Sequence, residues 1–144
     1  MTTTLSTRAL TERLLERIAE GDPERIAELH AEQVDWLVNW PETEHHRLET
    51  PWIRPRSTRA DIADLNRQLG THHVPGEAKV ETILVDGDDA VIMGEFHHTA
   101  KPTGRAYRSR FVLHVTFEDG LVVRNHVYED SLAIAQAFAS TPED

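Results

Sequence analysis

The stretch that decides the fold is AYRSRFVLHVTFEDGLVVRNHVYEDSLAIAQAF, residues 106–138. Its first two segments are rich in β-branched and aromatic residues that alternate with polar ones, which predicts strands at 106–117 and 121–128. The EDG between them is a short turn, and short turns join antiparallel neighbours. The last segment, DSLAIAQAF, predicts a short helix with Asp130 as its N-cap. A hairpin followed by a helix therefore closes the chain.

Two further strands are predicted directly upstream, at residues 79–85 and 90–98. A turn-type sequence, GDD, separates them, and a KPTG turn connects the second of them to the hairpin. Four strands with short connections form an antiparallel meander.

The N-terminal half of the chain has helical periodicity instead. A first helix is predicted over residues 7–20, and Gly21 ends it. Asp22-Pro23 starts a short second helix, residues 33–40 predict a strand, and a third helix is expected over 58–70. Helices first and a sheet afterwards indicate an α+β fold, with N-terminal helices packed on a curved, mostly antiparallel sheet.

The composition excludes several classes of protein. A chain of 144 residues is the size of one ordinary domain, and we expect a single domain over residues 1–144. The absence of cysteine excludes disulfides, thiolate nucleophiles and cysteine zinc sites. A net charge of −10 with scattered basic residues argues against nucleic acid as a partner. Because there is neither a signal-like N-terminus nor an apolar run of about 18–20 residues, we expect a cytoplasmic protein without membrane association.

The sequence resembles the nuclear transport factor 2-like superfamily, and within it the ketosteroid-isomerase-like and SnoaL-like branch. Four stretches carry the resemblance, which spans residues 10–138: DWLVNWPE, TPWIRP, KPTGRAYRSRF and VTFEDGLVVRNHVYEDSLAIAQAF. It implies a cone-shaped α+β barrel with one pocket for a small hydrophobic molecule, a homodimer, and metal-free chemistry without a cofactor. Members include isomerases, polyketide cyclases, dehydratases and binding modules, so a non-catalytic ligand-binding or dimerisation module is the alternative.

Side-chain alternation along the strands predicts which residues face the pocket. In the last strand, Leu121, Val123 and Val127 are apolar, so Asn125 and Glu129 share their face unless a β-bulge shifts the alternation. Six residues are expected to line a ligand: Trp36, Trp40, Trp52, Phe111, Leu113 and Val127.

The resemblance implies a base near the pocket mouth and deeper hydrogen-bond donors that hold an enolate. Five residues are candidates for these roles: His45, His46, Glu129, Asn125 and Tyr107. The base is one of the two histidines or the glutamate, and the donors are the asparagine and the tyrosine. The expected reaction is isomerisation, cyclisation or dehydration of a hydrophobic carbonyl compound.

Six of the nine histidines occur as adjacent pairs, which raises the alternative of a metal-dependent enzyme. Adjacent residues on a strand point to opposite faces, so at most one of His97 and His98 can join a given site. The same-face pair Glu95 and His97, joined by His45 and His73 from other segments, would give a histidine–carboxylate set suited to iron or another divalent metal.

Overall fold

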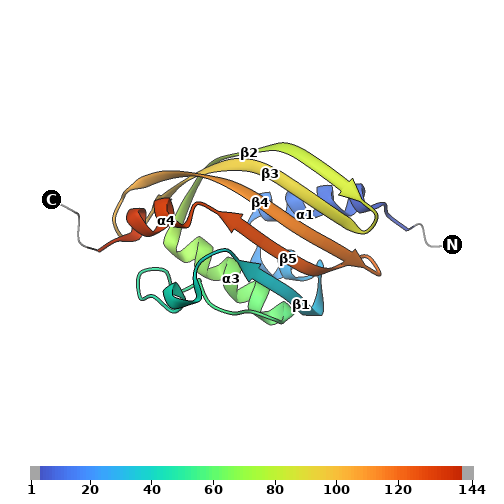
Figure 1. The fold of residues 1–144 in the computed structure, drawn as a ribbon, viewed down its shortest axis with the longest axis horizontal. Helices are drawn as coiled ribbons and strands as arrows, with labels where there is room; N and C mark the ends of the chain where they lie inside the picture. Colours follow the sequence, from blue (N-terminus) through green and yellow to red (C-terminus); the bar gives the residue numbers. More distant parts are fainter. Residues whose placement is uncertain (1–3, 141–144) are drawn as a thin grey trace.

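A computed structural model describes residues 4–140 and shows a five-stranded sheet with helices packed on its inner face (Figure 1). The elements follow in this order: α1 (Thr7–Glu20), α2 (Pro23–Ala27), β1 (His30–Val38), the short 3-10 helix η1 (Glu42–Glu44), α3 (Arg59–His72), β2 (His73–Asp86), β3 (Asp89–Ala100), β4 (Ala106–Glu118), β5 (Leu121–Glu129) and α4 (Ser131–Phe138). The predicted α+β fold is confirmed.

The strand order in the sheet is β1-β5-β4-β3-β2. Strands β2 to β5 form the predicted antiparallel meander, and β1 adds to β5 in parallel. In Figure 1 the strands β2, β3 and β4 arch over α3. The sheet is curved, but β1 and β2 remain its two edges. It therefore does not close into a barrel.

Two of the helix ends predicted from the sequence are confirmed, and one is wrong. Gly21 has φ 76° and caps α1, because its N–H donates to the carbonyl of Arg17. Thr58 and Asp61 form the capping box that starts α3. The predicted end of this helix at Gly70 is wrong: Gly70 has no positive φ, so α3 continues to His72 and β2 follows without a loop.

A β-bulge near the start of β5 changes which side chains face the helices. Thr116 and Phe117 are consecutive in β4, yet they pair with Arg124 and Val122 of β5, so one residue of β5 has no partner. Val122 is fully buried, and the predicted inward orientation of the odd-numbered positions at the start of this strand is wrong. Beyond the bulge three odd-numbered residues contact buried groups of the inner face, as predicted: Asn125, Val127 and Glu129.

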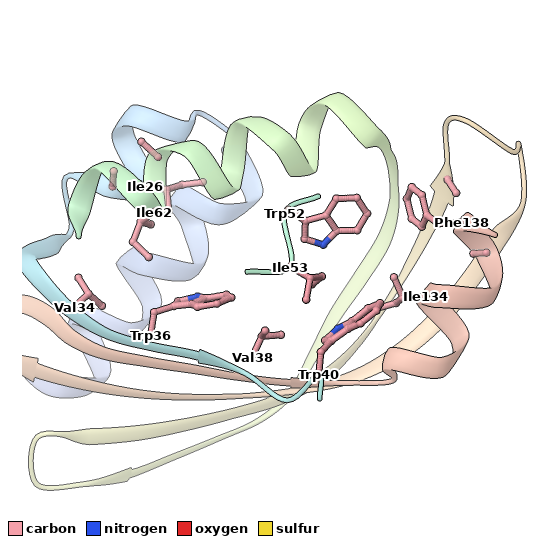
Figure 2. Close-up of a cluster of buried hydrophobic side chains, with 14 residues drawn as sticks. Ile26, Val34, Trp36, Val38, Trp40, Trp52, Ile53, Ile62, Ile134 and Phe138 are labelled. Atoms are coloured by element: carbon pink, nitrogen blue, oxygen red, sulfur yellow. The ribbon is translucent and has the colours of Figure 1, made fainter. Parts of the chain in front are cut away.

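Two hydrophobic clusters form the core. The smaller one lies between α1 and strands β3 to β5, with Leu14, Ile92 and Val115 at its centre. The larger one lies between α3, β1, α4 and the loop after β1 (Figure 2). None of the helices in residues 4–140 combines the length and hydropathy needed to cross a bilayer.

Candidate functional site

Glu129 is the last residue of β5, and its carboxylate contacts the interior of the fold. Trp40, which follows β1, donates a hydrogen bond from Nε1 to Oε2 of Glu129 at 2.7 Å. Asn39 fixes the backbone of Glu129 through two hydrogen bonds of 2.9 and 3.0 Å. Burial raises the pKa of Glu129, because the charged form loses hydration that the single indole donor only partly replaces. A carboxylate held in this way keeps free acceptor capacity and suits a general base.

Tyr107 of β4 lies near Glu129 on the same face of the sheet. Burial raises the pKa of Tyr107, and the negative charge of Glu129 raises it further. The phenol therefore stays protonated at neutral pH and can donate a hydrogen bond. Two of the five predicted site residues, Glu129 and Tyr107, thus lie on the same face of neighbouring strands, with Tyr107 four residues along β4 from Phe111, the cross-strand partner of Glu129.

A cluster of aromatic rings continues from Tyr107 towards the end of α3. We call it the aromatic cluster, and it contains six side chains: Trp52, His73, Phe96, His98, Tyr107 and Phe138. The shortest centroid separation is 4.5 Å, between Phe96 and His98, and the longest is 6.4 Å, between Tyr107 and Phe138. Figure 2 shows Trp52 below the C-terminal end of α3, with Phe138 of α4 beside it. Such ring pairs add to the energy of burial and fix one another's orientation.

The histidine pair in β3 is divided between the two faces of the sheet. His98 packs against Phe96, and its Nδ1 is buried without a hydrogen-bond partner among residues 4–140. The side chain of His97 is 52% exposed and lies 3.3 Å from the carboxylate of Glu95. The division of the pair was predicted, but His98 is the inward member.

The proposed metal set is therefore not assembled. Glu95 and His97 lie on the outer face, whereas His73 is buried among the rings of the inner face. The alternation of side chains along β3 causes this separation, since Glu95 shares its face with His97 and not with His98. In the part of the chain that the structure describes, no three histidine, aspartate or glutamate side chains lie close enough to hold a metal ion.

The two loop histidines differ in their relation to Glu129. His45 Nε2 lies 3.2 Å from the backbone carbonyl of Trp40, the residue whose indole binds Glu129. His46 has φ 65°, donates its backbone N–H to Ile53 and exposes its side chain to solvent. Of the two predicted bases in this loop, only His45 lies next to the residue that holds Glu129.

Asn125 takes a different role from the predicted donor. Its amide contacts His30, a buried histidine whose Nδ1 lies 3.0 Å from the carbonyl of Ile26. A carbonyl only accepts, so Nδ1 of His30 carries the proton, and burial keeps the ring neutral by lowering its pKa to about 4. Nε2 of His30 then accepts from Nδ2 of Asn125, which leaves Oδ1 of Asn125 as a buried acceptor with no partner in the described residues. Asn125 is also about 13 Å along the strand from Glu129, at roughly 3.3 Å per residue.

An ion-pair network fixes the long loop that carries Trp52. The guanidinium of Arg56 is fully buried and donates to the carbonyls of Trp52 and Asp61 at 3.1 and 2.7 Å. It also lies 3.1 Å from the carboxylate of Asp64 on α3. This loop is therefore held against the helix, and Trp52 is fixed in the aromatic cluster.

The predicted ligand-lining residues divide between the two core clusters. Trp36, Trp40 and Trp52 belong to the larger cluster, and Val127 packs against it. Phe111 packs against the smaller cluster, as does the sixth predicted residue, Leu113. The three indoles fill much of the space between α3 and the sheet (Figure 2).

A surface cavity of about 400 Å³ opens beside the aromatic cluster, which is a usual size for a small-molecule site. It lies between the loop after β1, the β3–β4 turn and α4, and its lining includes Leu48, His72, Arg105 and Phe138. Phe138 belongs both to this lining and to the aromatic cluster, so the cavity borders the cluster at this ring.

Three residues of this region were missed in the sequence: His98, His30 and Phe138. The sequence does indicate that His98 faces inward, because other even-numbered positions of its strand, such as Ile92 and Phe96, are apolar. No comparable pattern marks His30 or Phe138, since their positions depend on how α2 and α4 pack.

Comparisons with known proteins give a family and a fold. Residues 11–125 match the family of SnoaL-like domains. A solved NTF2-like protein from Burkholderia thailandensis E264 is 18% identical, with a TM-score of 0.79 over 94% of this chain and 99% of its own. A protein from Bacillus subtilis, provisionally described as an isomerase, is 17% identical with a TM-score of 0.78 over 97% and 100%. A provisionally described SnoaL-like polyketide cyclase from Mesorhizobium loti is 17% identical with a TM-score of 0.68 over 86% and 99%. No curated protein matches the sequence.

Proposed function

Because this chain belongs to the family of SnoaL-like domains, we propose that it is an enzyme that converts a small hydrophobic carbonyl compound by acid–base chemistry. The proposed reaction is an isomerisation, cyclisation or dehydration carried out by protein side chains, without a metal. The provisional descriptions of two proteins of the same fold, as an isomerase and a polyketide cyclase, support this reaction class.

The observation that carries the proposal is the carboxylate of Glu129, which contacts the interior through Trp40 and whose charge acts on Tyr107 on the same face of the sheet. Glu129 takes a proton from the carbon next to the carbonyl group, and the electron pair of that C–H bond moves towards the carbonyl oxygen. The hydroxyl of Tyr107 donates a hydrogen bond to the developing enolate oxygen. The protonated Glu129 then returns the proton to another carbon of the same molecule, which balances an isomerisation.

The raised pKa of Glu129 fits this role. A stronger base removes a carbon-bound proton faster, provided that it is still deprotonated at the working pH. The rate is expected to rise with pH through the pKa of Glu129 and then to level off.

The test uses cyclic β,γ-unsaturated ketones, whose conversion to the conjugated ketone is followed by ultraviolet absorbance. Glu129→Gln keeps the shape of the side chain and removes the base, so the rate is expected to fall by about 10²–10⁴-fold. Glu95→Gln is the matched control, because Glu95 is a carboxylate on the outer face of the same sheet. Equal rates for Glu129→Gln and the wild-type protein would refute the proposal.

A second candidate is a binding module without chemistry, and the tryptophan-filled interior favours it. The two functions differ in α-proton exchange, which is measured by NMR with the same ketones in deuterium oxide. Saturable binding of a ketone without any exchange above the Glu129→Gln background would support the binding module.

We also propose that two copies of the chain pair through the outer face of the sheet. This face exposes three apolar side chains that a monomer would leave in water: Leu37, Leu84 and Tyr128. Leu84 is 56% exposed, so Leu84→Glu is expected to convert a dimer to a monomer in sedimentation experiments. A monomeric wild-type protein at micromolar concentration would contradict this pairing.

A further inference from the structure

One polar atom of the inner face has no role in the mechanism above. His98 Nδ1 is buried, and no hydrogen-bond partner for it occurs within residues 4–140. Buried polar groups are nearly always paired, and an unpaired one calls for a physical explanation such as a ligand or an ordered water molecule. The outward neighbour, His97, has a carboxylate partner, so within this adjacent pair only the inward histidine has a buried nitrogen without a partner among residues 4–140.

The surroundings of His98 define what could supply that partner. Phe96 lies 4.5 Å from the imidazole, and the rings of His73 and Tyr107 lie at 5.3 and 6.0 Å. Flat apolar rings on several sides favour a flat apolar molecule. Burial lowers the pKa of both His98 and His73, so neither ring brings a positive charge to attract an anion.

Tyr107 connects His98 to the proposed base. It is the direct cross-strand neighbour of His98, and its hydroxyl lies in the field of the Glu129 carboxylate. An oxygen atom placed between the phenol and the imidazole would therefore contact two polar groups, with the base close by. His98 and Tyr107 both line a surface cavity of about 350 Å³, which also contacts Pro75 and Gly76 of β2, and this cavity is the proposed entry to the site.

Building on the proposed function, we infer that His98 binds the oxygen atom of the ligand, and that the ligand is a neutral planar ring compound with a hydroxyl or carbonyl group. His98 Nδ1 donates to a carbonyl oxygen or accepts from a hydroxyl group, according to which ring nitrogen carries the proton. In either case the ligand gives a partner to the buried Nδ1 of His98, which has none among residues 4–140.

The test measures binding of 2-naphthol, a neutral planar phenol, by calorimetry at pH 7. Loss of one neutral hydrogen bond in His98→Phe is expected to raise the Kd by about threefold to tenfold. Naphthalene has the same rings without the oxygen, so its affinity is expected to change by less than about twofold in the same variant. Nitrogen-15 NMR of the wild-type protein is expected to show a shift of His98 Nδ1 when 2-naphthol is added.

Two variants keep the result interpretable. His97→Asn changes the adjacent histidine on the opposite face and is expected to leave the Kd unchanged. His98→Asn keeps a polar nitrogen and oxygen near the position of Nδ1, so it is expected to bind 2-naphthol more tightly than His98→Phe does. It also tests whether an effect of His98→Phe comes from altered packing.

Three results would overturn the inference: no saturable binding of 2-naphthol by the wild-type protein, an equal Kd for His98→Phe, or an equal loss of naphthalene affinity. Failure of the proposed reaction is a separate outcome, because it is measured as turnover lost in Glu129→Gln. A protein that binds 2-naphthol through His98 but converts no ketone would keep this inference and reject the reaction.

Discussion

The two faces of the sheet use the same types of residue in opposite ways. On the inner face, burial raises the pKa of Glu129 and lowers the pKa of His73 to about 4, so charge is suppressed. On the outer face, hydrogen bonds from Thr116 and His114 lower the pKa of Asp89, so charge is favoured. Hydration decides the difference, because a charged group is costly only where neither water nor a partner replaces its solvation.

The comparison teaches where chemistry can lie on this fold. The outer face carries a chain of satisfied contacts, in which Asp89 meets His114 and Asp35 meets Arg124 and His126. Such groups are already paired and have little capacity left for a substrate. The inner face holds fewer polar groups, but several of them keep free bonding capacity, which a reaction requires.

The largest difference in the loss of stability is expected between substitutions of a buried and of an exposed arginine. Arg56→Ala removes a fully buried guanidinium and leaves the carbonyls of Trp52 and Asp61 without their donor, so the free energy of unfolding is expected to fall by about 2–5 kcal/mol. Arg108→Ala removes a side chain that is 70% exposed, and a loss of at most about 1 kcal/mol is expected. Urea unfolding of both variants measures the difference. Equal losses would show that burial does not set the strength of these ion pairs.

The second contrast concerns acid sensitivity. The pKa of His30 and the pKa of His73 are both lowered to about 4 by burial, from an ordinary value of 6.5. Between these values the unfolded chain binds more protons than the folded protein, so stability is full above about pH 6.5 and is lost as the pH falls towards 4. Each histidine contributes on the order of 3 kcal/mol to this loss, at about 1.4 kcal/mol per pKa unit.

Urea unfolding at pH 7, 5.5 and 4 measures this dependence, and His73→Phe is expected to flatten it. Glu129 acts with the opposite sign: its raised pKa makes its cost to stability greatest at high pH, and that cost disappears as the group takes up a proton. Repeating the series in a Glu129→Gln background separates the two contributions. An unchanged slope in His73→Phe would mean that this histidine is not buried in its neutral form.

The third contrast is between two glycines. Gly94 lies in β3, where an added Cβ atom would sit 2.2 Å from the carbonyl of Lys79 and 2.8 Å from the ring of Phe111. Gly94→Ala is therefore expected to cost about 1–3 kcal/mol through overpacking. Gly70 in α3 has no atom within 4 Å of an added Cβ, so Gly70→Ala is expected to stabilise the helix by about 0.5–1 kcal/mol. The two changes are compared by thermal unfolding, and a destabilised Gly70→Ala would contradict the packing argument.

The sequence predicted the elements better than it predicted the site. Strong local signals, such as the Asp130 N-cap and the turn at Gly21, appear in the structure as expected. The bulge in β5 could not be derived, because it depends on pairing with β4 and leaves no mark in the alternation of this strand. The inner-face positions of Glu129 and Tyr107 were predicted because strand alternation is local.

The partners of the site residues were not predictable in the same way. The indole that binds Glu129 comes from the segment after β1, 89 positions away, and two of the rings around His98 come from β4 and from the first residue of β2. Such contacts follow from the parallel addition of β1 and from the packing of helices. Neither is encoded in one short stretch of sequence.

The smallest loss of stability is expected for a substitution on the outer face of the sheet. Asp89→Asn removes the carboxylate that contacts Thr116 and His114, and a loss of about 0.2–1 kcal/mol is expected at pH 7, because Asp89 is 45% exposed. The pKa of Asp89 is lowered in the folded protein, so its contribution is present above the ordinary pKa of an aspartate and is lost as the pH falls through the folded value. The difference between Asp89→Asn and the wild-type protein is therefore expected to decrease as the pH falls below the ordinary pKa of an aspartate, and to shrink in 1 M salt. A larger loss at neutral pH that persists in salt would show that the outer face is not governed by screened charges, and that the contrast between the two faces needs another cause.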